Sequence, residues 1–138
     1  MAHRADRPAL SLQQLENSAR ADPPTGATRL IETVHRLRRK PIALLTAEDV
    51  RLLLGQRVGV PFLVPRALAM LEQDPLREGD LYPGDLLAST LRVPPSHWQT
   101  HHDHLDRLER ILSTLDPTAE NVDLLRKPIA SFRAQLRP

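Results

Sequence analysis

The stretch that decides the fold is PPSHWQTHHDHLDRLERILSTL, residues 94–115. Its apolar side chains recur every three or four residues with Arg, Asp and Glu between them, a period typical of a helix with one buried face. The members of this stripe are Trp98, His102, Leu105, Leu108, Leu112 and Leu115. We therefore predict one long helix that begins at the two prolines, with Trp98, Leu105, Leu108 and Leu112 in the core.

The same helical pattern continues on both sides of this stretch. Ser11 with Gln14, and Thr46 with Asp49, are paired at the spacing of helix caps. Helices are expected from Ser11, over 28–39, from Thr46, over 61–73, over 86–91 and from Pro117 onward. The run VGVPFLVP, residues 58–65, is rich in strand formers, but its two prolines cannot donate to a strand ladder. The sequence therefore predicts an all-α, single-domain orthogonal bundle of about six to seven helices.

Length and composition support this fold class and exclude others. The chain has 138 residues, a length typical of one domain, and 25 of its residues are Leu against four aromatic ones. It has no cysteine, which excludes disulfides and thiolate chemistry. No apolar run approaches the ~18–20 residues of a membrane span, and no apolar signal segment follows the first residues. We expect a cytoplasmic protein with residues 1–9 disordered and a single helical domain over 10–138.

Charge is unevenly distributed along a chain whose formal net charge is only +2. Residues 29–40 hold five basic residues against one acidic residue, whereas residues 72–85 hold five acidic residues against one arginine. Cations in the last turn of a helix complement its dipole, so we interpret the basic segment Arg36–Lys40 first as a helix end. Contact with nucleic acid is the alternative interpretation of this segment.

Few residues suggest catalysis or metal binding. The sequence contains neither a glycine-rich phosphate loop nor an HExxH motif. A histidine cluster consists of His97, His101, His102 and His104, of which His97 and His101 are spaced so that they could share one ion. On the predicted helix, His102 lies on the apolar stripe and the others on solvent faces. The four side chains would then not converge, and we predict no specific metal site.

The acidic segment is also rich in turn-forming residues, a setting in which functional side chains concentrate. Its carboxylates could serve as a recognition surface, as helix caps for the segment after Gly84, or, in a small enzyme, as a general acid–base pair. Because no nucleophile or histidine lies nearby in the sequence, a recognition surface is preferred to catalysis.

Residues 10–91 resemble the all-helical immunity proteins of bacterial contact-dependent growth inhibition (CDI) systems. The pieces that carry the resemblance are LRRKPI (37–42), Gly55–Gln56, LVPRAL (63–68) and DPLREGDLYPGDLL (74–87). The resemblance implies a cytoplasmic protein, not an enzyme, that binds and neutralises the C-terminal toxin domain delivered by a neighbouring cell. Such toxins are commonly nucleases. It implies no cofactor, small-molecule substrate or membrane partner, and it argues against a nucleic-acid partner.

A nuclease inhibitor must compete with a polyanion for a basic cleft, so an acidic loop suits this role. As a hypothesis, the toxin-facing residues are Glu72, Asp74, Glu78, Asp80, Tyr82 and Asp85. Tyr82, Pro83 and Gly84 are expected to form a turn that holds the loop against a helix. The alternative function is a small helical nucleic-acid-binding regulator that uses Arg36–Lys40.

Overall fold

The structure is a computed structural model that describes residues 10–17 and 25–136, so the expectation for residues 1–9 lies outside the described residues. Within this part of the chain the fold is all-α and no strand forms, which confirms the predicted fold class. The helices are α1 (Leu12–Leu15), α2 (Arg29–Arg38), α3 (Ala47–Gly55), α4 (Val60–Gln73), α5 (Asp85–Leu91), α6 (Pro95–Thr100), α7 (His102–Ser113) and α8 (Asp123–Leu136). Two short 3₁₀ turns, η2 (Ile42–Leu44) and η3 (Glu120–Val122), complete the described elements.

The helices begin where the local signals predict. The hydroxyls of Ser11 and Thr46 accept from the backbone N–H groups of Gln14 and Asp49, and both pairs form complete capping boxes. Thr28 caps α2 in the same way through Ile31 N–H. These contacts satisfy donors that the first turn of a helix leaves free.

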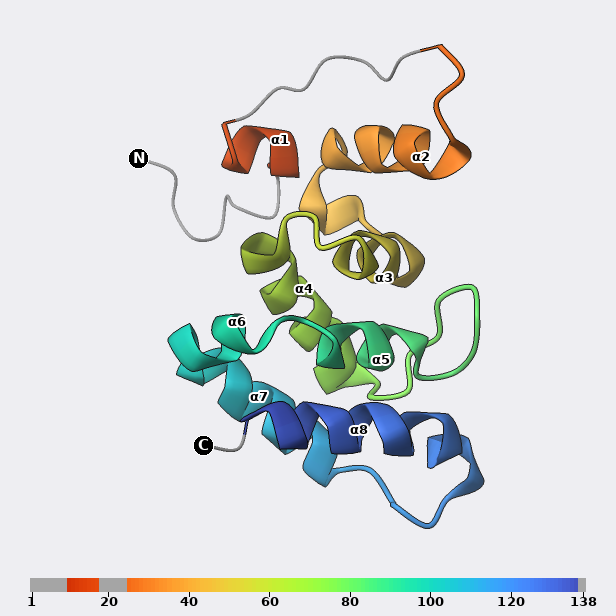
Figure 1. The fold of residues 1–138 in the computed structure, drawn as a ribbon, viewed down its shortest axis with the longest axis vertical. Coiled ribbons are helices and arrows are strands. Elements are labelled where there is room, and N and C mark those ends of the chain that lie inside the picture. Colours follow the sequence, from red (N-terminus) through yellow and green to blue (C-terminus); the bar gives the residue numbers. More distant parts are fainter. Residues whose placement is uncertain (1–9, 18–24, 137–138) are drawn as a thin grey trace.

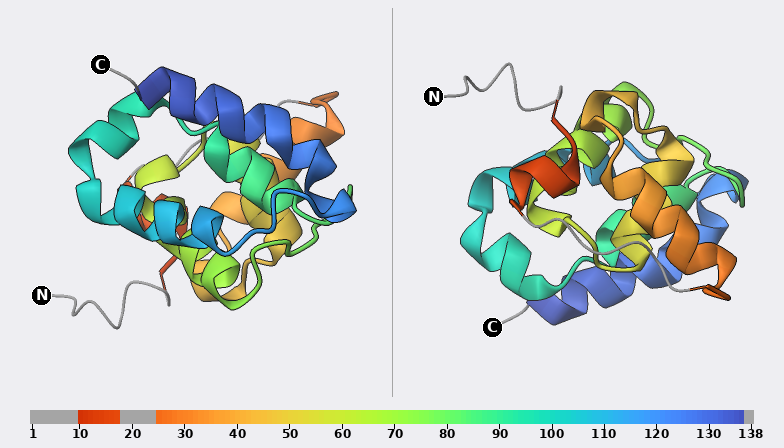
Figure 2. Two further views of the ribbon diagram at one scale, coloured as in Figure 1. Left: turned by 90° about the horizontal axis from the view of Figure 1, so that it is seen from below. Right: turned by 90° about the horizontal axis from the view of Figure 1, so that it is seen from above.

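Helix α4 forms the centre of the bundle. It runs steeply through the middle of the molecule, while α2 above it, α5 beside it and α8 below it run nearly horizontally (Figure 1). Leu63, Val64, Leu68 and Leu71 on α4 are fully buried, and the helix packs against α3, α5 and α7. Helix α8 closes the bundle by packing along α5, as both views of Figure 2 show. Every described helix therefore lies near a single hydrophobic core.

The predicted single helix over residues 94–115 is wrong in one respect, because it is broken at His101 into α6 and α7. His101 has φ −129° and ψ 70°, outside the helical region. The carbonyl of His97 accepts from the Thr100 hydroxyl at 3.2 Å and from His101 Nδ1 at 2.9 Å. Side chains that take up a carbonyl needed by the helical ladder favour such an interruption.

The predicted core of this segment is confirmed despite the break. Trp98 and Leu108 are fully buried, Leu112 is nearly so, and Leu105 packs partly buried against the same core. The Trp98 ring meets Phe132 of α8 edge to face at 5.9 Å, and its indole N–H donates to the Val93 carbonyl. The apolar period was therefore correct at these four positions, whereas His102, also placed on the stripe, is exposed because the backbone bends before it.

No helix in the described part of the chain is both long enough and apolar enough to cross a bilayer.

Candidate functional site

The acidic segment forms an ordered loop between the end of α4 and the start of α5, at the edge of the molecule beside α3 (Figure 1). We call residues 74–84 the acidic loop. Gly84 closes it with φ +93°, and its N–H donates to the Leu76 carbonyl at 3.0 Å. A β-carbon at Gly84 would lie 2.9 Å from Leu125, so both the positive φ and the close approach of α8 require glycine. The expected turn at Tyr82–Gly84 is therefore present.

Two carboxylates on the inner side of the acidic loop bind the backbone of its tip, which we define as residues 78–81. Asp85 accepts hydrogen bonds from the backbone N–H groups of Gly79 at 2.6 Å and Leu81 at 3.0 Å. Glu48 of α3 accepts from the N–H of Asp80, between them, at 2.9 Å. Three successive N–H groups are thus bound to carboxylates, which restricts the backbone of the tip.

An arginine holds these two carboxylates in place. Arg51 donates to both oxygens of Glu48, at 2.6 and 2.5 Å, and its Nε lies 3.8 Å from an oxygen of Asp85. The hydrogen bond from Arg51 is the main reason that the pKa of Glu48 is lowered. A charged donor favours the ionised form of a carboxyl group, so Glu48 accepts from the loop as an anion. We call Glu48, Arg51 and Asp85 the loop anchor.

Asp85 is therefore a correction to the proposed toxin-facing set. Its side chain is only 1% exposed and both of its oxygens are engaged with the loop backbone. A buried carboxylate of this kind holds structure and offers nothing to a partner. The sequence did not reveal Glu48 or Arg51, because their contacts with the loop span more than thirty residues and carry no local spacing signal.

With the backbone held from inside, the side chains of the tip point outward. Glu78 and Asp80 are exposed, and between Asp80 and Tyr82 the side chain of Leu81 is 64% exposed. Tyr82 is partly buried and packs against the core. Leu81 was not among the predicted site residues; the sequence shows a leucine next to Asp80 in a turn-rich acidic segment, but its exposure is known only from the structure.

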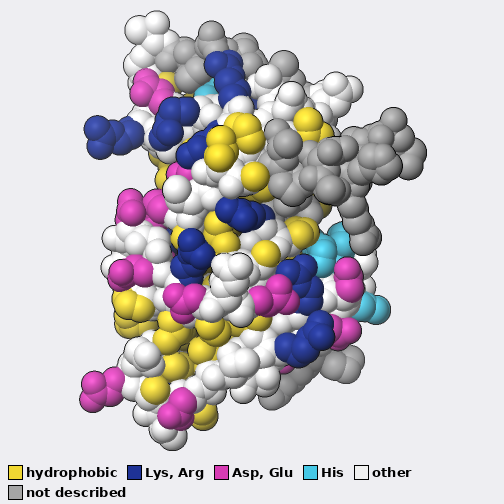
Figure 3. All heavy atoms as spheres, turned by 180° about the vertical axis from the view of Figure 1, so that it is seen from behind, with side chains coloured by type: hydrophobic (Ala, Val, Ile, Leu, Met, Phe, Trp, Pro, Cys, Tyr) yellow, Lys and Arg dark blue, Asp and Glu magenta, His cyan; other side chains and the backbone are white. Residues whose placement is uncertain are grey.

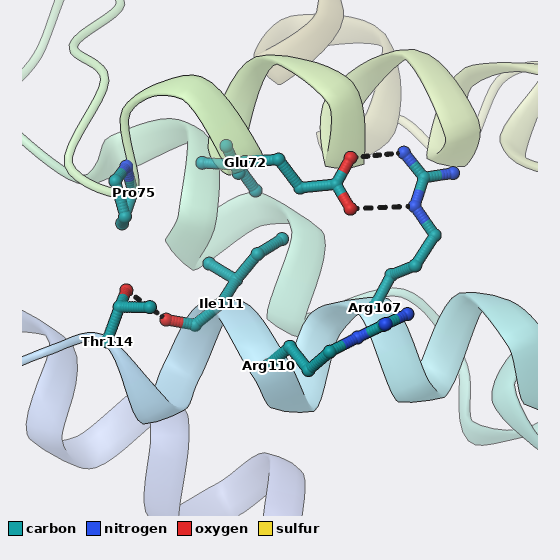
Figure 4. A pocket seen from close by; sticks show the side chains of 7 residues that line it. Glu72, Pro75, Arg107, Arg110, Ile111 and Thr114 are labelled. Atoms are coloured by element: carbon teal, nitrogen blue, oxygen red, sulfur yellow. Dashed lines mark hydrogen bonds and ion pairs between the residues drawn. The ribbon is translucent and has the colours of Figure 1, made fainter.

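Glu72 and Asp74 lie where α4 ends. Glu72 forms a two-pronged ion pair with Arg107 of α7 at 2.6 and 3.0 Å, and this contact lowers its pKa. Figure 4 shows the two side chains reaching toward each other across a groove of about 590 Å³. Asp74 is exposed and accepts from the Leu76 N–H at 3.2 Å. Glu72 thus joins two helices, while Asp74 shapes the start of the acidic loop.

The basic segment is drawn partly into the fold. Arg38 is 1% exposed and donates to Glu16 at 3.2 Å, and Lys40 donates to Asp49 at 3.1 Å. Arg36 and Arg39 lie on the surface. On the face shown in Figure 3, Lys and Arg side chains lie over the upper part and again in the middle and at the lower right, with Asp and Glu side chains along the left edge and among the lower cations. Two of the cations expected to attract nucleic acid therefore have acidic partners within the protein.

The structure overturns the prediction that the histidines diverge. Because the helix breaks at His101, the rings of His97, His101 and His104 stack, with centroids 4.2 to 5.2 Å apart. One nitrogen from each lies within 4.8 Å of the others, while His102 is exposed to solvent. His97 is buried, and burial, together with the neighbouring imidazoles, lowers its pKa to about 4.

These features define a small all-α protein with an ordered loop between α4 and α5 that carries exposed acidic side chains. The family model of CDI immunity proteins matches residues 14–108, and the chain belongs to this family. The match covers both the acidic loop and the histidine cluster, and it extends beyond residue 91, where the resemblance in the sequence ended. No curated protein matches the sequence significantly.

Proposed function

We propose that this immunity protein binds the C-terminal domain of its cognate CDI toxin through the acidic loop and that the toxin is a nuclease. The contact residues are Glu78, Asp80 and Leu81 at the tip, with Asp74 and the outer side of Glu72 beside them. Tyr82 supports the tip from below. The proposal places this encounter in the cytoplasm of the protected cell.

The observation that carries this proposal is the anchoring of the loop backbone. Three consecutive N–H groups, at Gly79, Asp80 and Leu81, are bound to the carboxylates of Asp85 and Glu48. A loop that is already ordered loses little conformational entropy on binding, so more of its contact energy becomes affinity. A mobile acidic loop would have no need for such an anchor.

The chemistry of the tip suits a nuclease partner. A nuclease attracts a polyanion with positive charge, and an acidic surface competes for the same cleft while speeding the encounter. Leu81 adds an apolar side chain at the centre of this surface, where desolvated contacts contribute most of the binding energy. The inhibitor itself performs no chemistry in this proposal, because Asp85 and Glu48 are occupied in holding the loop.

The test is a charge reversal at the tip with folding monitored in parallel. The double variant Glu78→Lys with Asp80→Lys is expected to slow association with the cognate toxin domain and to abolish growth rescue on co-expression. Leu81→Ala is expected to raise the dissociation rate, since it removes an apolar contact without changing charge. Nucleic-acid cleavage by the toxin domain, with and without the immunity protein, tests the nuclease part of the proposal.

The matched control reverses two exposed acidic residues away from the loop, Asp106 on α7 and Glu120 in η3. It changes the net charge by the same amount. Equal loss of affinity in both double variants would show that only overall charge matters, and unchanged affinity in the loop variant would move the interface elsewhere.

A further inference from the structure

We propose that His97, His101 and His104 form a binding site for one divalent late transition-metal ion, such as Zn²⁺, at the junction of α6 and α7. The inference is independent of the toxin-binding proposal, because it concerns another part of the molecule and is tested on the immunity protein alone. Its ligands are imidazole nitrogens, which suit Zn²⁺, Ni²⁺ and Cu²⁺ better than Mg²⁺ or Ca²⁺.

The spacing of the nitrogens fits one ion. Zn–N distances of about 2.0–2.1 Å in a tetrahedron place neighbouring ligand nitrogens about 3.4 Å apart. His97 Nε2 and His104 Nδ1 are 3.1 Å apart, and one nitrogen from each of the three rings lies within 4.8 Å of the others. The nitrogens therefore lie near the separation that one ion requires, although the rings must turn before all three lone pairs point at it.

The tautomer of His101 is set by its backbone contact. His101 Nδ1 lies 2.9 Å from the carbonyl oxygen of His97, which can only accept, and 3.0 Å from the Thr100 hydroxyl, whose own proton goes to the Ser96 carbonyl; both contacts are satisfied when Nδ1 carries the proton. The lone pair of this ring is then on Nε2, where it can bind the ion. A ligating histidine that donates its other N–H to a backbone carbonyl is a recurrent feature of metal sites.

His104 has a carboxylate near its outer nitrogen, at a distance too long for a hydrogen bond. Its Nδ1 points toward His97, and its Nε2 lies 3.9 Å from a carboxylate oxygen of Asp103. A carboxylate near the far nitrogen of a ligating histidine stabilises the positive charge that the ring gains on binding a cation. The ion would thus be held by Nε2 of His97, Nε2 of His101 and Nδ1 of His104.

Burial and access also favour this site. His97 is 7% exposed, so the ion would be held at the edge of the core and partly shielded from bulk water. His101 and His104 are partly exposed and line a groove of about 660 Å³ between α4 and α7. The three rings are nearly parallel, within 14° of one another. The partly exposed rings of His101 and His104 would therefore have to turn on binding until their lone pairs point at the ion. Water from the groove would complete the coordination.

The test uses the full-length chain without a histidine tag. Titration calorimetry with ZnCl₂ should show one ion per chain with a dissociation constant in the micromolar range or below. Co²⁺ should give the intense visible band of a four-coordinate ion, and Zn²⁺ should raise Tm. His101→Ala and His104→Ala should each weaken binding at least tenfold and remove the Co²⁺ band, whereas both remain folded because these side chains are partly exposed.

The control is His102→Ala, which removes an adjacent histidine that points to solvent. It should bind Zn²⁺ as the unmodified chain does. Failure of the unmodified chain to bind, several equal weak sites, or equal losses in His102→Ala and His101→Ala would each overturn the proposal.

Discussion

At the scale of single residues, acidic side chains that are close together in the sequence have different environments and different roles. Asp80 is exposed on the outer side of the acidic loop, while Asp85, five residues later, is buried and accepts from two backbone N–H groups. Unsatisfied buried donors are costly, so the two residues should respond differently to truncation. A mutation series that treats all these carboxylates alike would confuse effects on folding stability with effects on toxin affinity.

Asp85→Ala is expected to lower the free energy of unfolding by about 1–3 kcal/mol for each N–H group that it strands. Chemical denaturation measures this loss directly. Asp80→Ala is the comparison and should stay within about 0.5 kcal/mol of the unmodified protein, because its carboxylate is on the surface. Similar stability of the two variants would mean that Asp85 does not hold the loop.

Gly79 is needed because carboxylates crowd its α-carbon. A β-carbon there would lie 2.8 Å from Glu48 Oε1 and 3.0 Å from Asp85 Oδ2. Gly79→Ala should therefore displace the loop anchor, with a stability cost of roughly 1–3 kcal/mol and weaker toxin binding. Gly55→Ala on α3 is the control, since nothing lies within 4 Å of its β-carbon, and it should stabilise by about 0.4–1 kcal/mol. Chemical denaturation and toxin affinity should be measured on both variants. If Gly79→Ala were as stable and bound as tightly as the unmodified protein, the loop would tolerate the methyl group and the prediction would be wrong.

At the scale of elements, α3 is both a core helix and the support of the acidic loop. Val50 and Leu53 face the core, while Glu48 and Arg51 on the same helix form the part of the loop anchor that comes from another element. This arrangement couples the state of the loop to the protonation of one side chain.

The loop anchor predicts a pH dependence of stability. The pKa of Glu48 is lowered from its ordinary value of 4.5, mainly by the hydrogen bond from Arg51. A carboxyl group with a depressed folded-state pKa stabilises the fold above its unfolded pKa, and this contribution is lost as the pH falls through the folded value. Denaturation between pH 7 and pH 3 should therefore show stability falling below about pH 4.5, with a smaller fall in Glu48→Gln. A pH profile that Glu48→Gln leaves unchanged would contradict this assignment.

The two helices made by the break at His101 share one core face, with Trp98 on α6 and Leu108 on α7. Leu108→Ala should lower the free energy of unfolding by about 2–5 kcal/mol, because it opens a cavity between α7 and the rest of the bundle. Leu124→Ala is the control, since that side chain is 65% exposed. Thermal or chemical unfolding compares them, and a loss under about 0.5 kcal/mol at Leu108 would mean that the site is not packed.

At the scale of the whole molecule, association with a basic partner depends on where the charge lies, because the net charge is only +2. The rate of association with the toxin domain should fall by on the order of tenfold between low and high salt, since ions screen the acidic loop. The dissociation rate should change much less. Stopped-flow measurements on the unmodified protein and on the Glu78→Lys, Asp80→Lys variant test this, and equal salt dependence of the two would place the steering charges elsewhere.

Features that depend on neighbours in the sequence were predictable. Helix caps such as Ser11 and Thr46 and the apolar period around Leu108 rest on contacts within a few residues, and adjacent turn formers, Pro83 and Gly84, mark the turn that ends the acidic loop. Local sterics and hydrogen bonding determine such features, so the all-α class and most of the helices could be predicted from the sequence. The order of short motifs over residues 10–91 likewise indicated the immunity family before any fold was known.

Features that depend on distant parts of the chain were decided only by the tertiary structure. The capture of the Asp80 N–H by Glu48 joins residues 32 positions apart, and the burial of Arg38 against Glu16 joins residues 22 apart. The break at His101 depends on competition for the His97 carbonyl. Because of the break, His97 and His104 come together, which is the opposite of what an unbroken helix predicts. Spacing along the chain does not predict such contacts. Alternative local backbone conformations differ little in energy, and the packing of the whole core determines which of them is stable.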